Sequence, residues 1–254
     1  MKTKLIIILA IIISLGATSC RKGIFVTGNK NVITEKRELS GFSKLANNGS
    51  FEVTIIKDTI SYVVIEAESN IIQYIETRVD KGALIIDTRE TINARRPMKL
   101  TVYTPEMEAM ELNGSGSVFS EAFVSESFSA VVDGSGNITA TATSTNTYLR
   151  INGSGNLTAN LLTENLDAEI HGSGSIKLYG QGIHSDMEIH GSGDIDYFDF
   201  QQKYCAAISD GSGNIYVQVT DLLDAKILGS GSVYYRGNPI VNKEINGSGR
   251  VVKQ

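Results

Sequence analysis

The chain has 254 residues, 41% of them apolar, with 23 basic and 28 acidic side chains and a formal net charge of −5. This length and apolar content are sufficient for a folded domain with its own core. The acidic balance argues against nucleic acid as a partner, because phosphate binding needs clustered lysine and arginine.

Residues 1–19 have the pattern of a signal peptide. Lys2 and Lys4 precede an apolar run from residue 5 to residue 15, which is too short to span a bilayer. Small residues lead to Cys20, and the segment resembles a bacterial lipoprotein signal whose cleavage leaves Cys20 as the lipid-modified first residue. The alternative is an ordinary secretory signal that ends near a cysteine. We expect a lipid-anchored envelope protein, on the outer membrane, with residues 20–30 as a tether.

Cys205 is the only other cysteine in the chain. It lies in an apolar run without a catalytic histidine motif beside it, which predicts a buried and inert thiol. If Cys20 carries lipid, no intrachain disulfide can form.

Residues 31–112 lack the repeat described below, but they contain runs typical of strands, at 51–55, 62–66, 83–86 and 99–103. Ser69 is a suitable N-cap, and the isoleucines and Val79 after it fall near one helical face. This pattern predicts a short helix over 69–79. We expect the segment to form a less regular N-terminal cap that blocks edge pairing.

Residues 113–254 contain the tripeptide Gly-Ser-Gly eight times, at intervals of 18–20 residues. A fixed period in this range is typical of stacked units that cannot bury an apolar face alone. The first glycines of the eight motifs are Gly114, Gly134, Gly153, Gly172, Gly191, Gly211, Gly229 and Gly247.

Apolar and polar residues alternate around each motif, which predicts extended strands with one face inward. Leu166, Ala168 and Ile170, for example, share their parity with the glycines that follow. The sequence therefore predicts an all-β, parallel β-solenoid that forms one continuous domain with residues 31–112. Both glycines of each motif are expected to face a narrow interior, and the serine to face outward. The alternation slips near 208–210, where we expect a bulge.

These motifs also carry a family resemblance. The Asn-Gly-Ser-Gly and Asp-Gly-Ser-Gly-Asn-Ile repeats, the segment 49–53 (Gly-Ser-Phe-Glu-Val) and the segment 70–77 resemble the head GIN domain family, described as adhesin heads of the autotransporter type. The resemblance covers roughly residues 30–254. It implies a right-handed parallel β-helix and an envelope location, and it brings no catalytic or binding residue with it.

The first candidate site is a row of outward side chains. His171 and His190 hold the same position in consecutive coils, and Asp210 follows in the next coil. Two imidazoles and a carboxylate in line could bind a transition metal or respond to pH. The alternative is a permissive surface position, because Leu228 occupies the same place one coil later.

The second candidate is an aromatic pair, Tyr216 and Tyr234, which share an outward position on adjacent coils and could stack on a sugar ring. The alternative is an ordinary cross-strand pair. Asp194, Asp196 and Asp199 could act as the acid and base of a polysaccharide-cleaving enzyme, although solvated surface carboxylates are the usual cause of such runs. We expect no catalytic residue, no cofactor and no resident metal.

The expected function is that of a lipid-anchored envelope protein that presents a solenoid surface for binding, an adhesin. Two alternatives remain: a structural or envelope-homeostasis lipoprotein in the periplasm, and a polysaccharide-processing enzyme. The expected partners are a protein or glycan in the envelope or on a host or neighbouring cell. Self-association through the solenoid ends is a further expectation.

Overall fold

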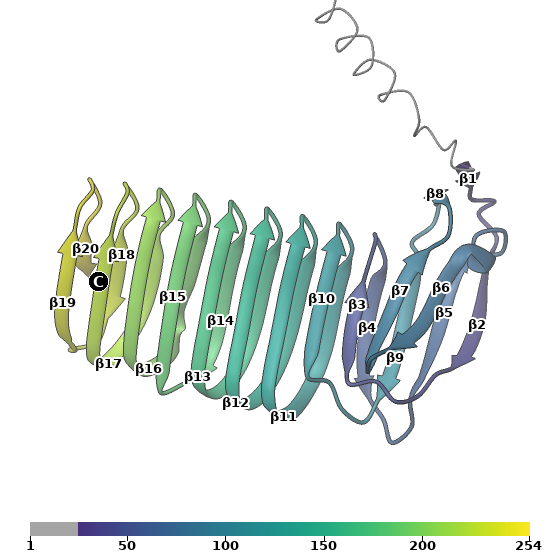
Figure 1. The fold of residues 1–254 in the computed structure, drawn as a ribbon, viewed down its shortest axis with the longest axis horizontal. Coiled ribbons are helices and arrows are strands. Elements are labelled where there is room, and N and C mark those ends of the chain that lie inside the picture. The colour runs from purple at the N-terminus through teal and green to yellow at the C-terminus, as the bar shows by residue number, and fades with distance from the viewer. Residues whose placement is uncertain (1–24) are drawn as a thin grey trace, which may run out of the picture.

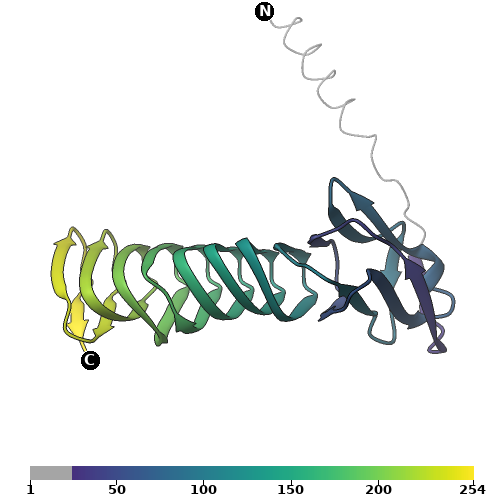
Figure 2. The same cartoon turned by 90° about the horizontal axis from the view of Figure 1, so that it is seen from below.

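The computed structural model describes residues 25–254, so the signal segment and Cys20 lie outside the described residues. The described chain is built almost entirely of strands stacked into an elongated solenoid (Figure 1, Figure 2). No helix within 25–254 is long and apolar enough to cross a membrane. The elements are β1 (Phe25–Thr27), β2 (Val32–Glu38), β3 (Lys44–Asn47), β4 (Glu52–Lys57), β5 (Tyr62–Glu68), η1 (Ile72–Tyr74), β6 (Ile75–Asp80), β7 (Ala83–Thr88), β8 (Thr91–Asn93), β9 (Lys99–Thr104), β10 (Ala109–Gly114), β11 (Ser117–Gly134), β12 (Asn137–Gly153), β13 (Asn156–Gly172), β14 (Ser175–Gln181), β15 (His184–Gly191), β16 (Asp194–Gly211), β17 (Ile215–Ile227), β18 (Val233–Arg236), β19 (Ile240–Ile245) and β20 (Val251–Lys253).

Each coil is a flattened loop with two sheet faces. The post-motif face contains the strand segments that follow each Gly-Ser-Gly, and the pre-motif face contains the segments that precede the next one. At the motif edge the chain turns through Gly-Ser-Gly. At the opposite edge, the bend edge, two adjacent exposed residues such as Thr145 and Asn146 interrupt the alternation and the strand turns back. Neighbouring coils pair in parallel register, as the alternation predicted.

The core runs the length of the stack between the two faces. Inward residues such as Leu149, Ile151 and Ile170 are fully buried, and each further coil adds a similar apolar layer to the core. Because a single coil has only its neighbours against which to bury this layer, stacking itself supplies the hydrophobic stabilisation.

The glycines are required chiefly by the contact between coils. The first glycine of a motif is not inward: Gly172, for example, is half-buried, and Gly247 in the last motif is exposed. A β-carbon on Gly172 would lie 2.2 Å from the carbonyl oxygen of Gly153 in the preceding coil, and its φ is +139°. That oxygen accepts the backbone N–H groups of Ser173 and Gly174 at 2.8 and 3.2 Å. Only the second glycine, Gly174, also faces the interior, where Ile151 would contact an added β-carbon.

The parallel stack extends toward the N-terminus beyond the repeated motif. The strands β3 and β4 pair with β10 and β11, and they are joined by a turn at Gly49 that lacks a second glycine. Gly116 donates its N–H to the oxygen of Gly49, as later motifs do to one another. β7 and β9 add a further parallel layer. The antiparallel strands β2, β5 and β6 then end the stack, and β1 pairs with β8 in a separate two-stranded sheet.

The predicted helix over 69–79 is wrong. Only the 3₁₀ turn η1, three residues long, is helical, and the chain continues as β6. β6 pairs antiparallel with β7 over its whole length. Ile75, Thr77 and Val79 are β-branched, so tertiary pairing and strand propensity outweigh the helical spacing.

The predicted bulge at 208–210 is also wrong. Ile208, Ser209 and Asp210 keep unbroken register with β15. The apolar alternation is interrupted in the sequence because a serine occupies a core position. Ser209 is fully buried, and its hydroxyl donates to the carbonyl oxygen of Gly213 at 2.9 Å. The register shifts lie elsewhere, after Phe119 and between Tyr197 and Tyr204, among other places.

Candidate functional site

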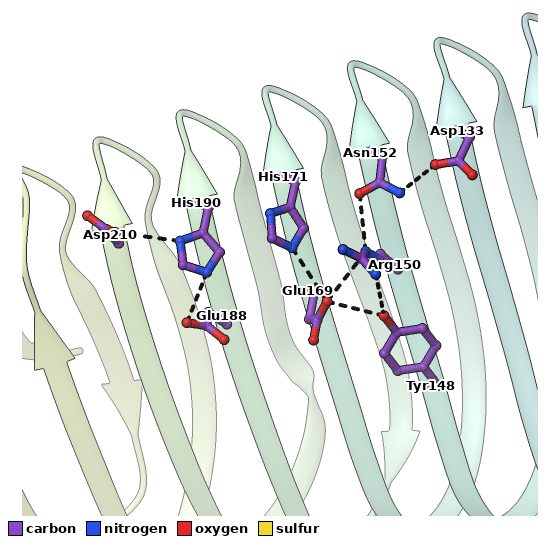
Figure 3. Close-up of polar contacts among 9 residues, drawn as sticks. All are labelled: Asp133, Tyr148, Arg150, Asn152, Glu169, His171, Glu188, His190 and Asp210. Carbon is purple, nitrogen blue, oxygen red and sulfur yellow. Dashed lines mark hydrogen bonds and ion pairs between the residues drawn. The ribbon is translucent and has the colours of Figure 1, made fainter.

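A row of polar side chains lies on the pre-motif face beside the Gly-Ser-Gly turns (Figure 3). Its members directly precede the motif in five consecutive coils and pair in register: Asp133, Asn152, His171, His190 and Asp210. Strand pairing therefore brings together the two histidines and the aspartate that the sequence singled out.

The two imidazole rings are stacked on one another. Their centroids lie 4.9 Å apart, and the ring planes differ by 19°. Each Nε2 atom points to the carboxylate two residues earlier on its own strand, at 3.5 Å for His171 with Glu169 and 2.9 Å for His190 with Glu188. Nδ1 of His190 lies 3.5 Å from Asp210. Side chains of the fold already surround the ring nitrogens of His190.

The adjoining part of the row is organised by Arg150. Its guanidinium donates to the Tyr148 hydroxyl at 3.2 Å and to the Asn152 side chain at 3.1 Å, and it lies 3.4 Å from the Glu169 carboxylate. Tyr148 donates to Glu169 at 3.2 Å, and Asn152 donates to Asp133. Burial, with the Glu169 charge beside it, raises the pKa of Tyr148. The row is a network in which neighbouring coils satisfy one another's polar groups (Figure 3).

This geometry does not suit a metal centre. Stacked rings hold their nitrogen lone pairs in parallel planes rather than aimed at one point, whereas a metal needs ligands that converge. Within residues 25–254, no group of three or more His, Cys, Asp and Glu side chains is placed to hold a metal ion.

We therefore expect zinc to bind neither the wild type nor His190→Ala. Calorimetry with zinc at neutral pH should give equal, negligible heats for both proteins, because the stacked rings do not aim their nitrogens at one point. A heat of binding that His190→Ala abolishes would show instead that the row rearranges to hold the ion.

The two tyrosines lie on the other face of the solenoid. Tyr216 and Tyr234 stack on each other with centroids 5.0 Å apart and planes 11° apart, and the Phe198 ring meets Tyr216 edge-on. Arg236 lies over Phe198, 3.9 Å from its centroid. The facing surfaces of the two tyrosines are thus covered by each other, which is the geometry of a cross-strand pair. The tyrosines and the histidines do not form one site.

The acidic cluster is engaged in local structure. Asp194 accepts hydrogen bonds from the backbone and side chain of Asn214 in the next coil, at 2.8 and 3.2 Å. Asp196 accepts the backbone N–H of Phe198 at 3.3 Å. These contacts stabilise a local turn and the pairing of neighbouring coils. They do not place two carboxyl groups opposite each other as the acid and base of a hydrolase.

The thiol of Cys205 is buried, as predicted. Burial raises its pKa to about 12, so the reactive thiolate is scarce at neutral pH.

Two grooves accompany these rows. One, of about 670 Å³, lies on the pre-motif face and is lined by Tyr148, Asp167 and Asp186 among others. Burial and the neighbouring carboxylates, Glu169 first among them, raise the pKa of Asp167. The other, of about 690 Å³, follows the bend edge. Neither groove is predicted from the sequence, because the glycine motif marks only the edge of the coils at which it lies.

The fold and these surfaces define a class: a β-solenoid that presents ordered rows of side chains. The family described as "Putative auto-transporter adhesin, head GIN domain" matches residues 41–239, and the chain belongs to this family. The resemblance seen in the sequence is confirmed. The comparison with curated proteins found no match.

Solved structures share the fold. A putative adhesin from Parabacteroides merdae ATCC 43184 is 19% identical with a TM-score of 0.86, over 91% of this chain and 99% of that one. A putative lipid binding protein from Parabacteroides distasonis ATCC 8503 is 27% identical with a TM-score of 0.85 over the same shares. A putative adhesin from the same strain is 22% identical, with a TM-score of 0.81, over 91% and 100% of the two chains.

Proposed function

We propose that this protein is a lipid-anchored adhesin of the cell envelope, without catalytic activity, whose solenoid presents a binding surface. The family match over residues 41–239 carries the proposal. The architecture supports it, because parallel coils hold exposed side chains in fixed rows along both faces. A rigid array of this kind suits recognition of an extended or repeating partner.

The first described residues lie at the cap end of the solenoid, and this position supports anchoring of the molecule at that end. β1 begins at Phe25 beside the antiparallel cap, while the coils extend away from it (Figure 1). An acyl group on Cys20 would attach the cap end of the molecule to the outer membrane. The coils would then project from the membrane, with both faces and the bend edge accessible.

A second candidate function is lipid binding. The relative that is 27% identical is described as a putative lipid binding protein. In this chain, the groove at the bend edge contains two exposed apolar side chains, Val124 and Leu162. Binding to phosphatidylcholine vesicles that Leu162→Ser abolishes would support this candidate.

We expect the wild type to sediment with membranes and to be labelled on intact cells by a membrane-impermeant reagent. Cys20→Ser should leave the membrane fraction, because no acyl chain can then attach. A protein that labels only after the outer membrane is opened would be a periplasmic lipoprotein, and the adhesin proposal would fail. Retention of Cys20→Ser in the membrane fraction would contradict the lipid anchor on Cys20. The surface-labelling result would still test the adhesin function separately.

A further inference from the structure

The groove along the bend edge lies where each coil turns from the post-motif to the pre-motif face. We call it the bend groove. It has a volume of about 690 Å³, which is in the range of ligand sites. It crosses several consecutive coils and is lined by Val124, Ser125, Thr143, Ser144, Thr145, Leu162, Thr163, Glu164, Gln181, Gly182, Ile183, Gln201, Gln202, Lys203 and Thr220.

One wall of the bend groove is a row in strict register. Its members pair successively across five coils: Val124, Thr143, Leu162, Gln181 and Gln201. Each therefore stands one strand spacing, ~4.8 Å, from the next. The groove thus offers a series of contact positions with a regular repeat along the solenoid axis.

The groove is open where one coil breaks. β12, β13 and β16 pass the bend edge without interruption, whereas β14 ends at Gln181 and β15 begins at His184. Gly182 lies in this gap, and a β-carbon there would lie 2.9 Å from the Phe200 ring. The glycine therefore fits the packing below it and leaves no side chain over the groove.

Polar groups in the bend groove have unused hydrogen-bonding capacity. Within the described chain, the side chains of Thr143, Thr145, Gln181 and Gln201 make no hydrogen bond to other protein groups, and all four are exposed. Gln202, by contrast, is 1% exposed and its amide atoms are buried, so a ligand in the groove does not reach them. The histidine row differs, because its members hydrogen-bond or pair with one another.

The composition of the bend groove indicates the chemistry of its ligand. Its charged side chains are one acid and one base, Glu164 and Lys203, so it favours a neutral partner. The exposed apolar side chains of Val124 and Leu162 are separated by Thr143 in the row. An acyl chain needs a continuous apolar strip, whereas a sugar offers C–H faces and hydroxyls in alternation.

We propose that the bend groove binds a linear, neutral polysaccharide that runs along the solenoid axis. The exposed amides of Gln181 and Gln201 exchange hydrogen bonds with its hydroxyls, and Val124 and Leu162 contact its C–H faces. Successive sugars then meet successive members of this row, one from each coil. The inference rests on the proposed adhesin function and names the class of ligand that the adhesin recognises.

A glycan array of neutral and acidic oligosaccharides tests this, probed with the full chain carrying Cys20→Ser so that no acyl group contributes. We expect retention on linear neutral glycans and at least a tenfold loss of affinity in the double variant Gln181→Ala, Gln201→Ala. Both side chains are exposed, so the melting temperature should not change. The matched control is Asn160→Ala, an exposed amide outside the groove, which should bind as the parent does.

Each contrary outcome has a distinct meaning. Retention on no glycan, or binding that the double variant keeps, overturns the groove proposal. Binding to phosphatidylcholine vesicles that Leu162→Ser abolishes and the double glutamine variant keeps assigns the groove to lipid instead. Surface labelling on intact cells together with a silent array would refute the groove ligand alone, whereas absence of surface labelling refutes the adhesin function itself.

Discussion

Gly172→Val is expected to lower the free energy of unfolding by about 2–6 kcal/mol, the sum of backbone strain and overpacking. The added β-carbon would lie 2.2 Å from the carbonyl oxygen of Gly153, which is backbone and cannot rotate away. The φ of +139° at Gly172 is a second obstacle, because side chains rarely adopt it. Denaturant titration of purified protein measures the loss.

Two control variants separate the causes. Ser173→Ala removes an exposed hydroxyl and keeps the N–H that donates to Gly153, so it should change stability by less than about 0.5 kcal/mol. Gly41→Ala tests positive φ alone, because Gly41 has φ +78° and no atom within 4 Å of an added β-carbon. It should cost about 1–2 kcal/mol. Equal losses for Gly172→Val and Ser173→Ala would refute the stacking explanation.

Glu68→Gln is expected to destabilise the cap by about 1–3 kcal/mol, because it replaces a buried acceptor with an amide that directs a donor at other donors. Glu68 is 1% exposed at the end of β5. Its carboxylate accepts the backbone N–H groups of Arg95 and Arg96 at 2.7 and 3.2 Å, and also that of Lys30. It thereby joins β5 to the segments that flank β1 and β8.

The contribution of Glu68 depends on pH. Burial alone would raise the pKa of this carboxyl, but the N–H groups of Arg95, Lys30 and Arg96 outweigh it and hold the pKa below the usual 4.5. A lowered pKa in the folded state means that the stabilisation is complete above pH 4.5 and is lost as pH falls through the folded value. The difference in unfolding free energy between wild type and Glu68→Gln should therefore shrink in acid. A difference that stays constant from neutral to strongly acidic pH would contradict this account.

The two effects bear on function because the coils must stay in register to present ordered rows. The glycine contacts fix the spacing between coils, and the cap protects one end of the stack from pairing with other chains. Loss of either would disturb the bend groove and the histidine row together.

Much of the architecture followed from the sequence alone, for a physical reason. The spacing of Gly114, Gly134 and Gly153 and the two-residue alternation between them depend only on local backbone geometry, so period and phase predict stacked parallel coils. The same phase predicted that His171 and His190 would be neighbours, because register in a solenoid converts sequence period into spatial adjacency.

Contacts between coils decided several features that the periodicity of the sequence does not predict. The segment 69–79 has apolar residues at helical spacing, but pairing with β7 makes residues 75–80 a strand. Ser209 made the alternation look shifted by one residue in the sequence. In the fold it is a core residue in unbroken register, because its hydroxyl donates a hydrogen bond to the carbonyl oxygen of Gly213. Glu169 and Glu188 each lie beside the Nε2 atom of a histidine on the same strand. The sequence shows that these carboxylates are present, but not that they point toward the histidines.

The bend groove depends most strongly on tertiary structure. Its residues come from coils about one period apart, and the opening at Gly182 arises because one strand breaks where its neighbours continue. The sequence determined that coils would stack and which residues would share a row, since both follow from local periodicity. The folded chain decided which rows satisfy themselves and which keep free hydrogen-bonding groups, since that depends on side chains meeting across the stack.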